Sequence, residues 1–244
     1  MVSMNSRRSE MKQPLMGLFI VFVFLVQGSV FGQSNSEADM PLTSAKNLRL
    51  INVSATPVTS NGKSGIEVKA ESPGFRGETL VLIPGVLFAN GTIEVELSGD
   101  VIPGADPRMR GFVGVAFRVD PENTAYYDCF YIRPRNGRAG NQVQRNHATQ
   151  YVAHPEFPWH RLRRESAGEY ESYVDLVPGE WTKLKLEISG NKARFYVHDS
   201  AQPVLIVNDL KHPEKPGLIG LWLHPTTLAR YRNLKVRPGE QGNP

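Results

Sequence analysis

The sequence predicts an all-β protein in which two antiparallel sheets pack face to face. Short segments with an apolar residue at every second position recur along the chain, and turn residues separate them. The 22 Gly and 18 Pro residues supply many turns. No segment carries the 3.6-residue period of a convincing helix. Because such strands bury one face and solvate the other, two stacked sheets give them a common core.

The expected strands follow one another from the N-terminal third to the C-terminus. The segment 92–97 alternates most clearly, with Ile93 toward the core and Glu94 toward water. Tight turns are expected at Asn61-Gly62 and at Gly190-Asn191. The predicted strands are 48–53, 64–69, 79–82, 92–97, 112–119, 126–133, 170–176, 181–188, 192–197, 204–210, 217–223 and 227–236.

Three of these strands carry polar and aromatic side chains on the face opposite the core. If Phe130 faces the core, then Tyr131 and Arg133 point the other way, and the same parity puts Arg118 beside them. The corresponding face of 217–224 carries Trp222 and His224. Small residues accompany Arg118 on its strand, which favours a concave surface.

Residues 134–169 show no sustained period, and we expect them to form a long irregular insertion that closes over this concave face. Insertions of this length in a compact domain are more often functional than idle. From Arg133 to Glu169 the chain has seven Arg and three Glu residues, a formal charge of +4. A local basic field of this kind attracts anionic ligands.

The N-terminal region predicts export to the periplasm or the exterior. Arg7, Arg8 and Lys12 precede an apolar run over 15–26, and small residues before Gln33 form a cleavage site. An uncleaved membrane anchor is the alternative, although the run is short for a span of about 20 residues. After cleavage we expect no stable membrane span.

The expected organisation is one domain with short flanking segments: a signal peptide over 1–32, a flexible leader over 33–44, the domain over 45–237 and a disordered tail over 238–244. Translation could start at Met1, Met4 or Met11. Removing 1–32 lowers the formal charge from +4 to +2, so a nucleic-acid partner is not suggested. The single Cys129 excludes an internal disulfide.

The C-terminal half resembles the concanavalin-A-like lectin and glucanase superfamily, in its laminin-G-like and 3-keto-disaccharide-hydrolase-like branches. The resemblance rests on GEWTKLKLEISGNKARFYVHD, PVLIVNDL, PGLIGLWL and ARYRNLKV, with GTIEVEL and GFVGVAFRV matching earlier strands. It covers residues 45–237 and implies a two-sheet antiparallel jelly roll. The same fold carries lectins, hydrolases, lyases and adhesion modules, so the resemblance does not fix an activity.

The chain departs from the enzymes of this fold in its motifs. Laminarinase-type glucanases carry E-x-D-x-x-E on one strand, whereas Glu94 and Glu96 are followed by Leu97-Ser98-Gly99. The chain therefore lacks the strand motif that usually supplies the two carboxylates of the retaining mechanism. Alginate-lyase relatives use Arg, Gln, His and Tyr; the chain has these residue types but not the strings Q-I/V-H or Y-F-K-A-G.

The candidate site combines groups that recognise sugars with groups that move protons. We expect His154 and Tyr131 as catalytic candidates, because His titrates near neutrality, with a hydrogen-bonded structural His154 as the alternative. Arg133 could instead form a salt bridge with Asp128 or Glu171, and Trp159 could pack the insertion onto the sheet. The substrate-binding candidates are Arg118, Arg133, Gln150, Tyr151, Trp159, Trp222 and His224.

No metal site or cofactor is predicted. His147, His154 and His160 are seven and six residues apart, which matches no compact metal signature. A structural calcium ion is implied by the resemblance alone, and its oxygen ligands cannot be placed from the sequence.

Three functions remain open: a glycan-active hydrolase or lyase, a non-catalytic glycan-binding module, and a structural or adhesion domain. The Arg, Tyr, Gln and His cluster favours the first, and the missing carboxylate motif favours the second. The expected partner is a carbohydrate, which the basic insertion allows to be anionic.

Overall fold

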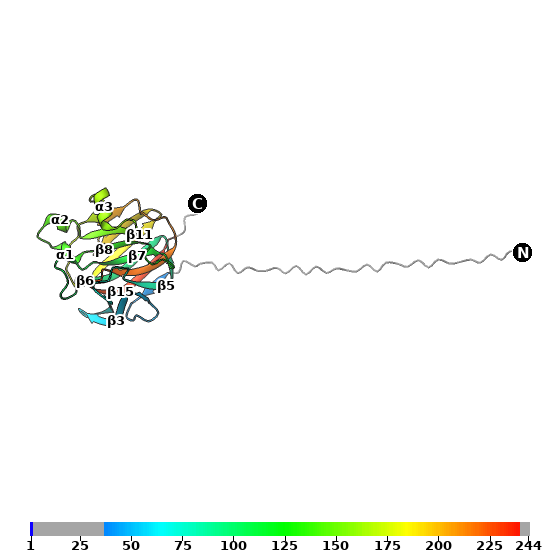
Figure 1. The fold of residues 1–244 in the computed structure, drawn as a ribbon, viewed down its shortest axis with the longest axis horizontal. Coiled ribbons are helices and arrows are strands. Elements are labelled where there is room, and N and C mark those ends of the chain that lie inside the picture. Colours follow the sequence, from blue (N-terminus) through cyan, green and yellow to red (C-terminus); the bar gives the residue numbers. More distant parts are fainter. Residues whose placement is uncertain (2–36, 240–244) are drawn as a thin grey trace. The chain divides into compact units, whose positions relative to one another are not determined.

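The computed structural model describes Met1 and residues 37–239, and the expected signal peptide lies outside this part of the chain. No helix within the described residues is long and apolar enough to cross a membrane. The regular secondary structure of the described domain is mostly β-strand, with three short helices (Figure 1). The predicted two-sheet antiparallel sandwich is confirmed.

Sheet A contains the two ends of the described domain. Residues 38–40, expected to be part of a flexible leader, form a strand that pairs with the last strand, and Leu42 is buried. In spatial order sheet A consists of β13 (Leu205–Val207), β12 (Lys192–Val197), β11 (Thr182–Ser189), β6 (Gly91–Val101), β15 (Thr227–Pro238), β4 (Lys63–Ala70) and β3 (Val53–Ser60), with β1 (Ala38–Met40) pairing to β15.

Sheet B contains the strands that carry the candidate residues Tyr131, Gln150 and Trp222. All its pairings are antiparallel. In spatial order it consists of β10 (Glu171–Ser172), β9 (Thr149–His154), β8 (Tyr127–Ile132), β7 (Val113–Val119), β14 (Gly217–Leu223), β5 (Leu80–Phe88) and β2 (Arg49–Ile51).

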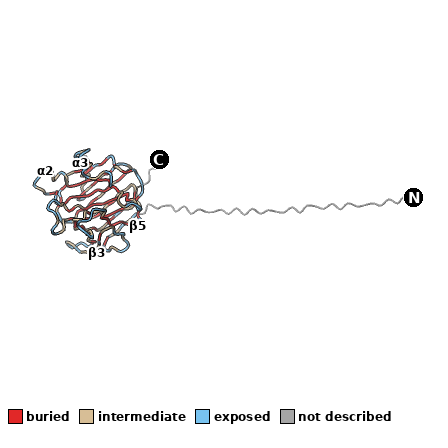
Figure 2. Tube along the Cα trace, viewed as in Figure 1, coloured by how far each residue is buried: buried red, intermediate tan, exposed pale blue. Residues whose placement is uncertain are grey.

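The hydrophobic core lies between the two sheets. Alternate residues of β11 are buried, as their apolar period predicts. Phe130 of sheet B and Phe195 of sheet A meet across the interior with ring centroids 5.4 Å apart, and Phe117 stacks on Phe130 at 6.2 Å. The strands are accordingly mostly red in Figure 2, whereas α2 is tan and blue.

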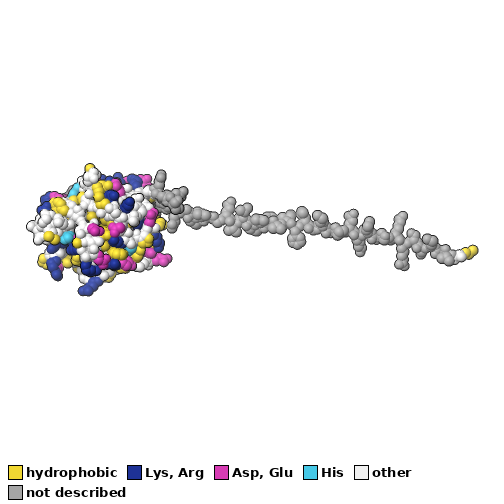
Figure 3. Space-filling model, turned by 90° about the horizontal axis from the view of Figure 1, so that it is seen from above, with side chains coloured by type: hydrophobic (Ala, Val, Ile, Leu, Met, Phe, Trp, Pro, Cys, Tyr) yellow, Lys and Arg dark blue, Asp and Glu magenta, His cyan; other side chains and the backbone are white. Residues whose placement is uncertain are grey.

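The outer face of sheet A is charged and solvated. Glu67 pairs with Arg230 at 3.0 Å, and Glu96 pairs with Lys63 at 3.3 Å and with Arg232 at 3.5 Å. Figure 3 shows the general pattern, with basic and acidic side chains interspersed over the visible surface. Such pairs on an exposed sheet contribute little stability individually.

The prediction of a structureless insertion over 134–169 is wrong. This segment forms α1 (Pro134–Gly137), α2 (Gln142–Arg145), β9 and α3 (Trp159–Glu165), and the first two helices lie toward one side of the strands in Figure 1. β9 pairs with β8 along its whole length. It lacks an alternating pattern because five of its six residues are buried, so both faces need apolar or fully paired side chains.

The position of Arg118 also differs from the prediction. Arg118 has φ +53°, and the register between β7 and β14 shifts beside it, as in a β-bulge. The bulge turns the guanidinium toward the carbonyl oxygens of Ala89 and Gly190, which accept from Nη2 at 2.9 and 2.7 Å. Arg118 therefore does not lie beside Tyr131.

Candidate functional site

The outer face of sheet B is the side of the sheet away from the core, and it carries Tyr127, Tyr131, Gln150, His154 and Trp222. The register of β7, β8, β9 and β14 places these residues on one side. Neighbouring segments cover part of this face. For example, α3 lies against β9, and its Leu162 is 2% exposed.

A pair of aromatic rings forms the centre of this face. Gly114 of β7 is opposite both Tyr131 and Trp222, and a Cβ at Gly114 would lie 2.5 Å from the Cβ of Tyr131. Because Gly114 has no side chain, the two rings approach each other to 4.9 Å between centroids. Tyr131 is buried, whereas Trp222 stays partly exposed. Trp222 thus presents a supported aromatic surface.

A hydrogen-bond relay fixes the indole of Trp222. Its Nε1 donates to the hydroxyl of Tyr127 at 3.1 Å, and that hydroxyl donates to the carboxylate of Glu78. Tyr127 is 1% exposed, while Glu78 and Trp222 are partly exposed. The relay holds one aromatic ring and one carboxylate in a fixed geometry.

Glu78 is the residue of this face that sequence reasoning missed. Burial raises the pKa of its carboxyl group, and the hydrogen bond from Tyr127 acts in the opposite direction. A carboxyl group with a raised pKa beside an aromatic ring can donate a proton. The residue precedes β5 in a segment without a regular pattern, so no periodic signal marks it.

His154 ends β9 directly opposite Tyr127, and their rings are 5.2 Å apart. The pKa of His154 is lowered from 6.5 to about 4, mainly by burial and to a smaller extent by the nearby charges of His212 and His160. The imidazole is therefore neutral at neutral pH and can accept a proton or a hydrogen bond. Its geometry is compatible with the role predicted for it.

His224 lies at the same face beyond the end of β14. Its Nδ1 is 2.8 Å from the hydroxyl of Thr226, and its ring is 5.2 Å from that of Phe112. Burial lowers the pKa of His224. Together with Trp222, Glu78 and His154, it gives this face its partly exposed polar and aromatic groups.

Arg133 and Gln150 belong to an internal network. Arg133 pairs with Glu171 at 3.3 Å, donates to the side-chain oxygen of Gln150 at 2.8 Å and donates to the hydroxyl of Tyr131 at 3.0 Å. Glu171 also accepts from Arg163 and lies 2.7 Å from Nδ1 of His147. Of the alternatives left open for Arg133, the salt bridge with Glu171 is the one that forms. The network uses both terminal nitrogens of Arg133 and the whole side-chain amide of Gln150.

Two more candidates lie away from this face. Tyr151 is opposite Phe130 and points into the core, where its hydroxyl contacts Asp128 and accepts from the backbone N–H of Lys211. Trp159 is 46% exposed on α3, and the guanidinium of Arg163 lies 4.8 Å from its ring centroid. The structure therefore brings Tyr131, His154, Trp222 and His224 to one face, and it separates Arg118 and Tyr151 from them.

Two hollows lie elsewhere on the domain. One of about 550 Å³ is on the outer face of sheet A, where Trp181 is surrounded by charged residues that include Glu96 and Lys183. Another of about 200 Å³ is at the turn between β7 and β8. The first has one aromatic residue among paired charges, whereas the outer face of sheet B has a continuous aromatic and polar relay.

The calcium ion that the resemblance implies has no cluster of acidic ligands among the described residues. Within 37–239 no group of three or more His, Cys, Asp or Glu side chains is placed to hold a metal ion. Asp209, a carboxylate near a turn, is bonded to Lys211 at 2.6 Å and to Tyr170 at 2.7 Å.

Comparison with known proteins identifies the fold. No protein family and no curated protein matches the sequence. A Bacillus subtilis protein of unknown function with a galectin-like fold is 16% identical, with a TM-score of 0.52 over 82% of this chain and 94% of that one. A putative glycosyl hydrolase from Parabacteroides distasonis is 15% identical, with a TM-score of 0.50 over 83% and 100%.

A third solved structure, the cellulose induced protein Cip1, is 8% identical, with a TM-score of 0.51 over 85% of this chain and 100% of that one. These likenesses, together with the sheet order, confirm the concanavalin-A-like jelly roll that the sequence resembles. At such low identity they show the fold alone.

Proposed function

We propose that this protein binds carbohydrate through the outer face of sheet B. The observation that carries the proposal is the indole of Trp222, which is partly exposed, packed on Tyr131 and held by the hydroxyl of Tyr127. A fixed aromatic ring offers apolar area to the face of a sugar ring. Because the ring is already ordered, binding costs little additional conformational entropy.

Polar groups at the edge of this ring suit the hydroxyls of a sugar. Glu78 can accept hydrogen bonds, and the neutral imidazoles of His154 and His224 can accept or donate them. Two neighbours in fold support the proposal by their names, since one is a putative glycosyl hydrolase and another is induced by cellulose. A neutral glycan fits this site better than an anionic one, because Arg133 is already paired with Glu171.

Catalysis is the second candidate, and one observation favours it: the raised pKa of Glu78, which suits a general acid. Most hydrolases of glycosidic bonds use a second carboxylate as base or nucleophile. Glu171, a second carboxylate on this side of the sheet, is occupied by Arg133, Arg163 and His147. Binding without turnover is therefore the function that the geometry supports best.

Retention on polysaccharide gels tests the proposal. The chain should be retained on at least one gel from a panel of neutral and uronic polysaccharides, and Trp222→Phe should weaken that retention about tenfold or more. Trp181→Phe is the matched control, because Trp181 lies on the outer face of sheet A and should leave retention unchanged. A wild-type chain that passes every gel without retention contradicts the proposal.

Product analysis separates binding from catalysis. If the protein only binds, incubation with the retained polysaccharide yields neither new reducing ends nor the absorbance of an unsaturated sugar. If it is an enzyme, products appear with the wild type and disappear with Glu78→Gln, which removes the proton donor while keeping the size of the side chain.

The proposal includes an exported location, periplasmic or secreted, supported by the basic and apolar N-terminal segment before Gln33. Mass spectrometry of the protein recovered outside the cytoplasm tests this directly. A mature N-terminus near Gln33 is expected, and recovery of the intact chain from the cytoplasm alone contradicts it.

A further inference from the structure

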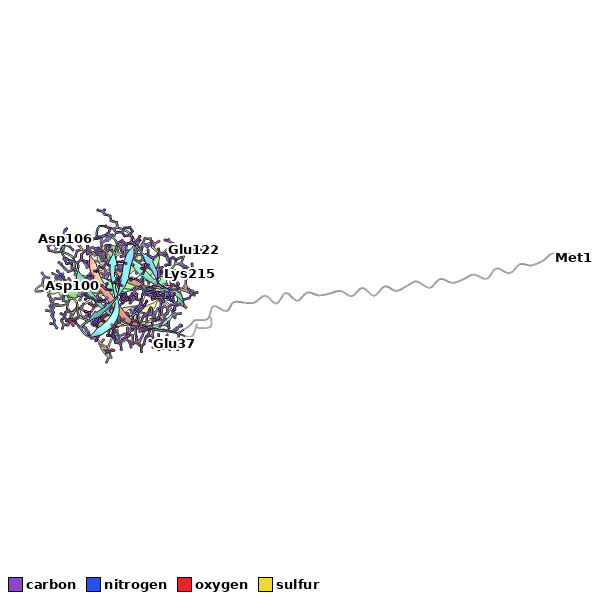
Figure 4. All side chains as sticks on the ribbon, turned by 90° about the horizontal axis from the view of Figure 1, so that it is seen from below. Met1, Glu37, Asp100, Asp106, Glu122 and Lys215 are labelled. Carbon is purple, nitrogen blue, oxygen red and sulfur yellow. The ribbon has the colours of Figure 1, made fainter. Side chains whose placement is uncertain are left out.

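The cavity at the turn between β7 and β8 has features of a second binding site. It measures about 200 Å³, and its lining includes Arg118, Tyr126, His212 and Lys215. It lies at the opposite end of β8 from Arg133. Figure 4 shows Lys215 near Glu122, a residue of this turn, on the side of the domain away from Asp100 and Asp106.

Arg118 brings a rigid donor to this cavity. Its Nε and Nη2 donate to the carbonyl oxygen of Ala89 at 3.1 and 2.9 Å, and Nη2 also donates to that of Gly190 at 2.7 Å. Arg118 is 4% exposed, and its Nη1 has no hydrogen-bond partner among the described residues. The guanidinium is thus held on one side and unsatisfied on the other.

His212 and Asp128 bring two more unsatisfied atoms to the same region. His212 is 5% exposed and stacks on Tyr126 with centroids 3.9 Å apart. Its Nδ1 lies 3.7 Å from Oδ2 of Asp128, and neither atom has a hydrogen-bond partner in the described structure. Asp128 is fully buried; burial raises its pKa, and the nearby charges of His212 and Arg118 lower it.

These unpartnered atoms require an explanation, because buried polar groups in folded proteins are nearly always hydrogen-bonded. Arg118 and His212 line the cavity, whereas Asp128 does not line it but lies 3.7 Å from His212. One group satisfies Arg118 and Asp128 at once: a hydroxyl, which accepts from Nη1 and donates to Oδ2. A phosphate or a carboxylate could accept from Arg118 but would meet the carboxylate of Asp128 unfavourably. The chemistry therefore favours a hydroxyl-bearing ligand over an anion.

The size of the cavity limits the ligand. Pockets for drug-sized molecules are about 300–1,000 Å³, so a cavity of about 200 Å³ suits a single small ring. Lys215, which is 3.5 Å from Asp120, and Asn123 add polar groups to the lining. We propose that this cavity binds one monosaccharide unit, whose hydroxyl bridges Arg118 and Asp128 after a small shift of the His212 ring.

This site is separate from the outer face of sheet B, so it can be tested independently. The chain is titrated calorimetrically with glucose, galactose, mannose and glucuronate, and with inorganic phosphate as the anion probe. The expected result is saturable binding of at least one monosaccharide, with one site per chain and no binding of phosphate. Trp222→Phe should leave this binding unchanged.

Two variants locate the binding in the cavity. His212→Phe keeps a ring to stack on Tyr126 and removes both nitrogens, whereas Asp128→Asn keeps an oxygen for Tyr151 and replaces the acceptor Oδ2 with a donor. Each should weaken monosaccharide binding about tenfold or more. Thermal unfolding shows whether each variant is folded at the temperature of titration, and either folded variant suffices for the test.

Several outcomes overturn the inference. If no monosaccharide binds saturably, or if a folded variant binds as well as the wild type, the three atoms are satisfied by ordered water only. Binding of phosphate in preference to every sugar makes this an anion site. Loss of monosaccharide binding in Trp222→Phe moves the ligand to the outer face of sheet B, and that result leaves the proposed function standing.

Discussion

Arg133 and Glu171 form a buried ion pair, with Nη1 3.3 Å from Oε1 and the two side chains 5% and 3% exposed. The pair joins the end of β8 to β10, on the side of the sheet that carries Tyr131. Arg133 also donates hydrogen bonds to Tyr131 and Gln150. The ion pair therefore holds the ring of Tyr131 in place, and Trp222 packs against that ring.

Removing one partner of this pair should be costly. Glu171→Gln leaves Arg133 and Arg163 without their carboxylate, and we expect a loss of roughly 3–5 kcal/mol in the free energy of unfolding, measured with urea. Asp175→Asn is the control, since it breaks an exposed pair with Arg138 and should cost about 1 kcal/mol or less. Equal losses in the two variants contradict a structural role for the buried pair.

The stability of the protein should fall as the pH is lowered from 6.5 toward 4. In this window His154 takes up a proton readily in the unfolded chain but poorly in the folded one, because burial lowers its folded pKa to about 4. Because the unfolded state then binds more protons, the free energy of unfolding falls. The loss reaches about 2 kcal/mol, once the effect of the pKa shift is reduced for the partial exposure of the ring.

The variant His154→Gln isolates this effect. It should flatten the fall in unfolding free energy between pH 6.5 and 4. His160→Gln, at an exposed position, should change the slope only slightly, because the charge of His160 is the smallest cause of the lowered pKa of His154. An unchanged slope in His154→Gln shows that other groups set the pH dependence.

Gly114 should tolerate no side chain. In Gly114→Ala the new Cβ lies 2.2 Å from the carbonyl oxygen of Phe130, so β7 and β8 must separate locally. Overpacking of this kind costs about 1–3 kcal/mol, and the shift should also weaken polysaccharide retention by disturbing Tyr131 and Trp222. Gly140→Ala, where no atom lies within 4 Å of the new Cβ, should have little effect on either property.

Cys129 should be unreactive in the folded protein. It is fully buried, and burial raises the pKa of its thiol well above the usual value. An aromatic disulfide reagent should therefore titrate no thiol in the native state and one after unfolding in guanidinium chloride. Rapid labelling of the native protein contradicts the burial of this strand.

The alternation of apolar and polar residues predicted most of the strands. The segments 92–97 and 181–188 show their buried positions directly, because one face of each strand packs in the core and the other meets water. Strand β9 was not predicted, because both of its faces are covered. Its sequence, Thr149–His154, therefore lacks the alternation of apolar and polar residues that marks a half-exposed strand.

The candidate site was predicted in part. Strand parity placed Tyr131 and Trp222 on one face, and they are in contact there. Parity failed for Arg118, because a bulge at a non-glycine residue shifts every later position and has no sequence signal of its own. Glu78 could not be found either, since its position depends on the hydroxyl of Tyr127 rather than on any local pattern.

Tryptophan fluorescence tests the central claim most directly. The protein has three Trp residues, and a bound sugar ring should change the emission of Trp222 saturably when the chain is titrated with soluble fragments of the retained polysaccharide. We predict that Trp222→Phe abolishes this change, whereas Trp159→Phe and Trp181→Phe keep it. A saturable change that persists in Trp222→Phe and disappears in Trp181→Phe would place the glycan on the outer face of sheet A and contradict the account.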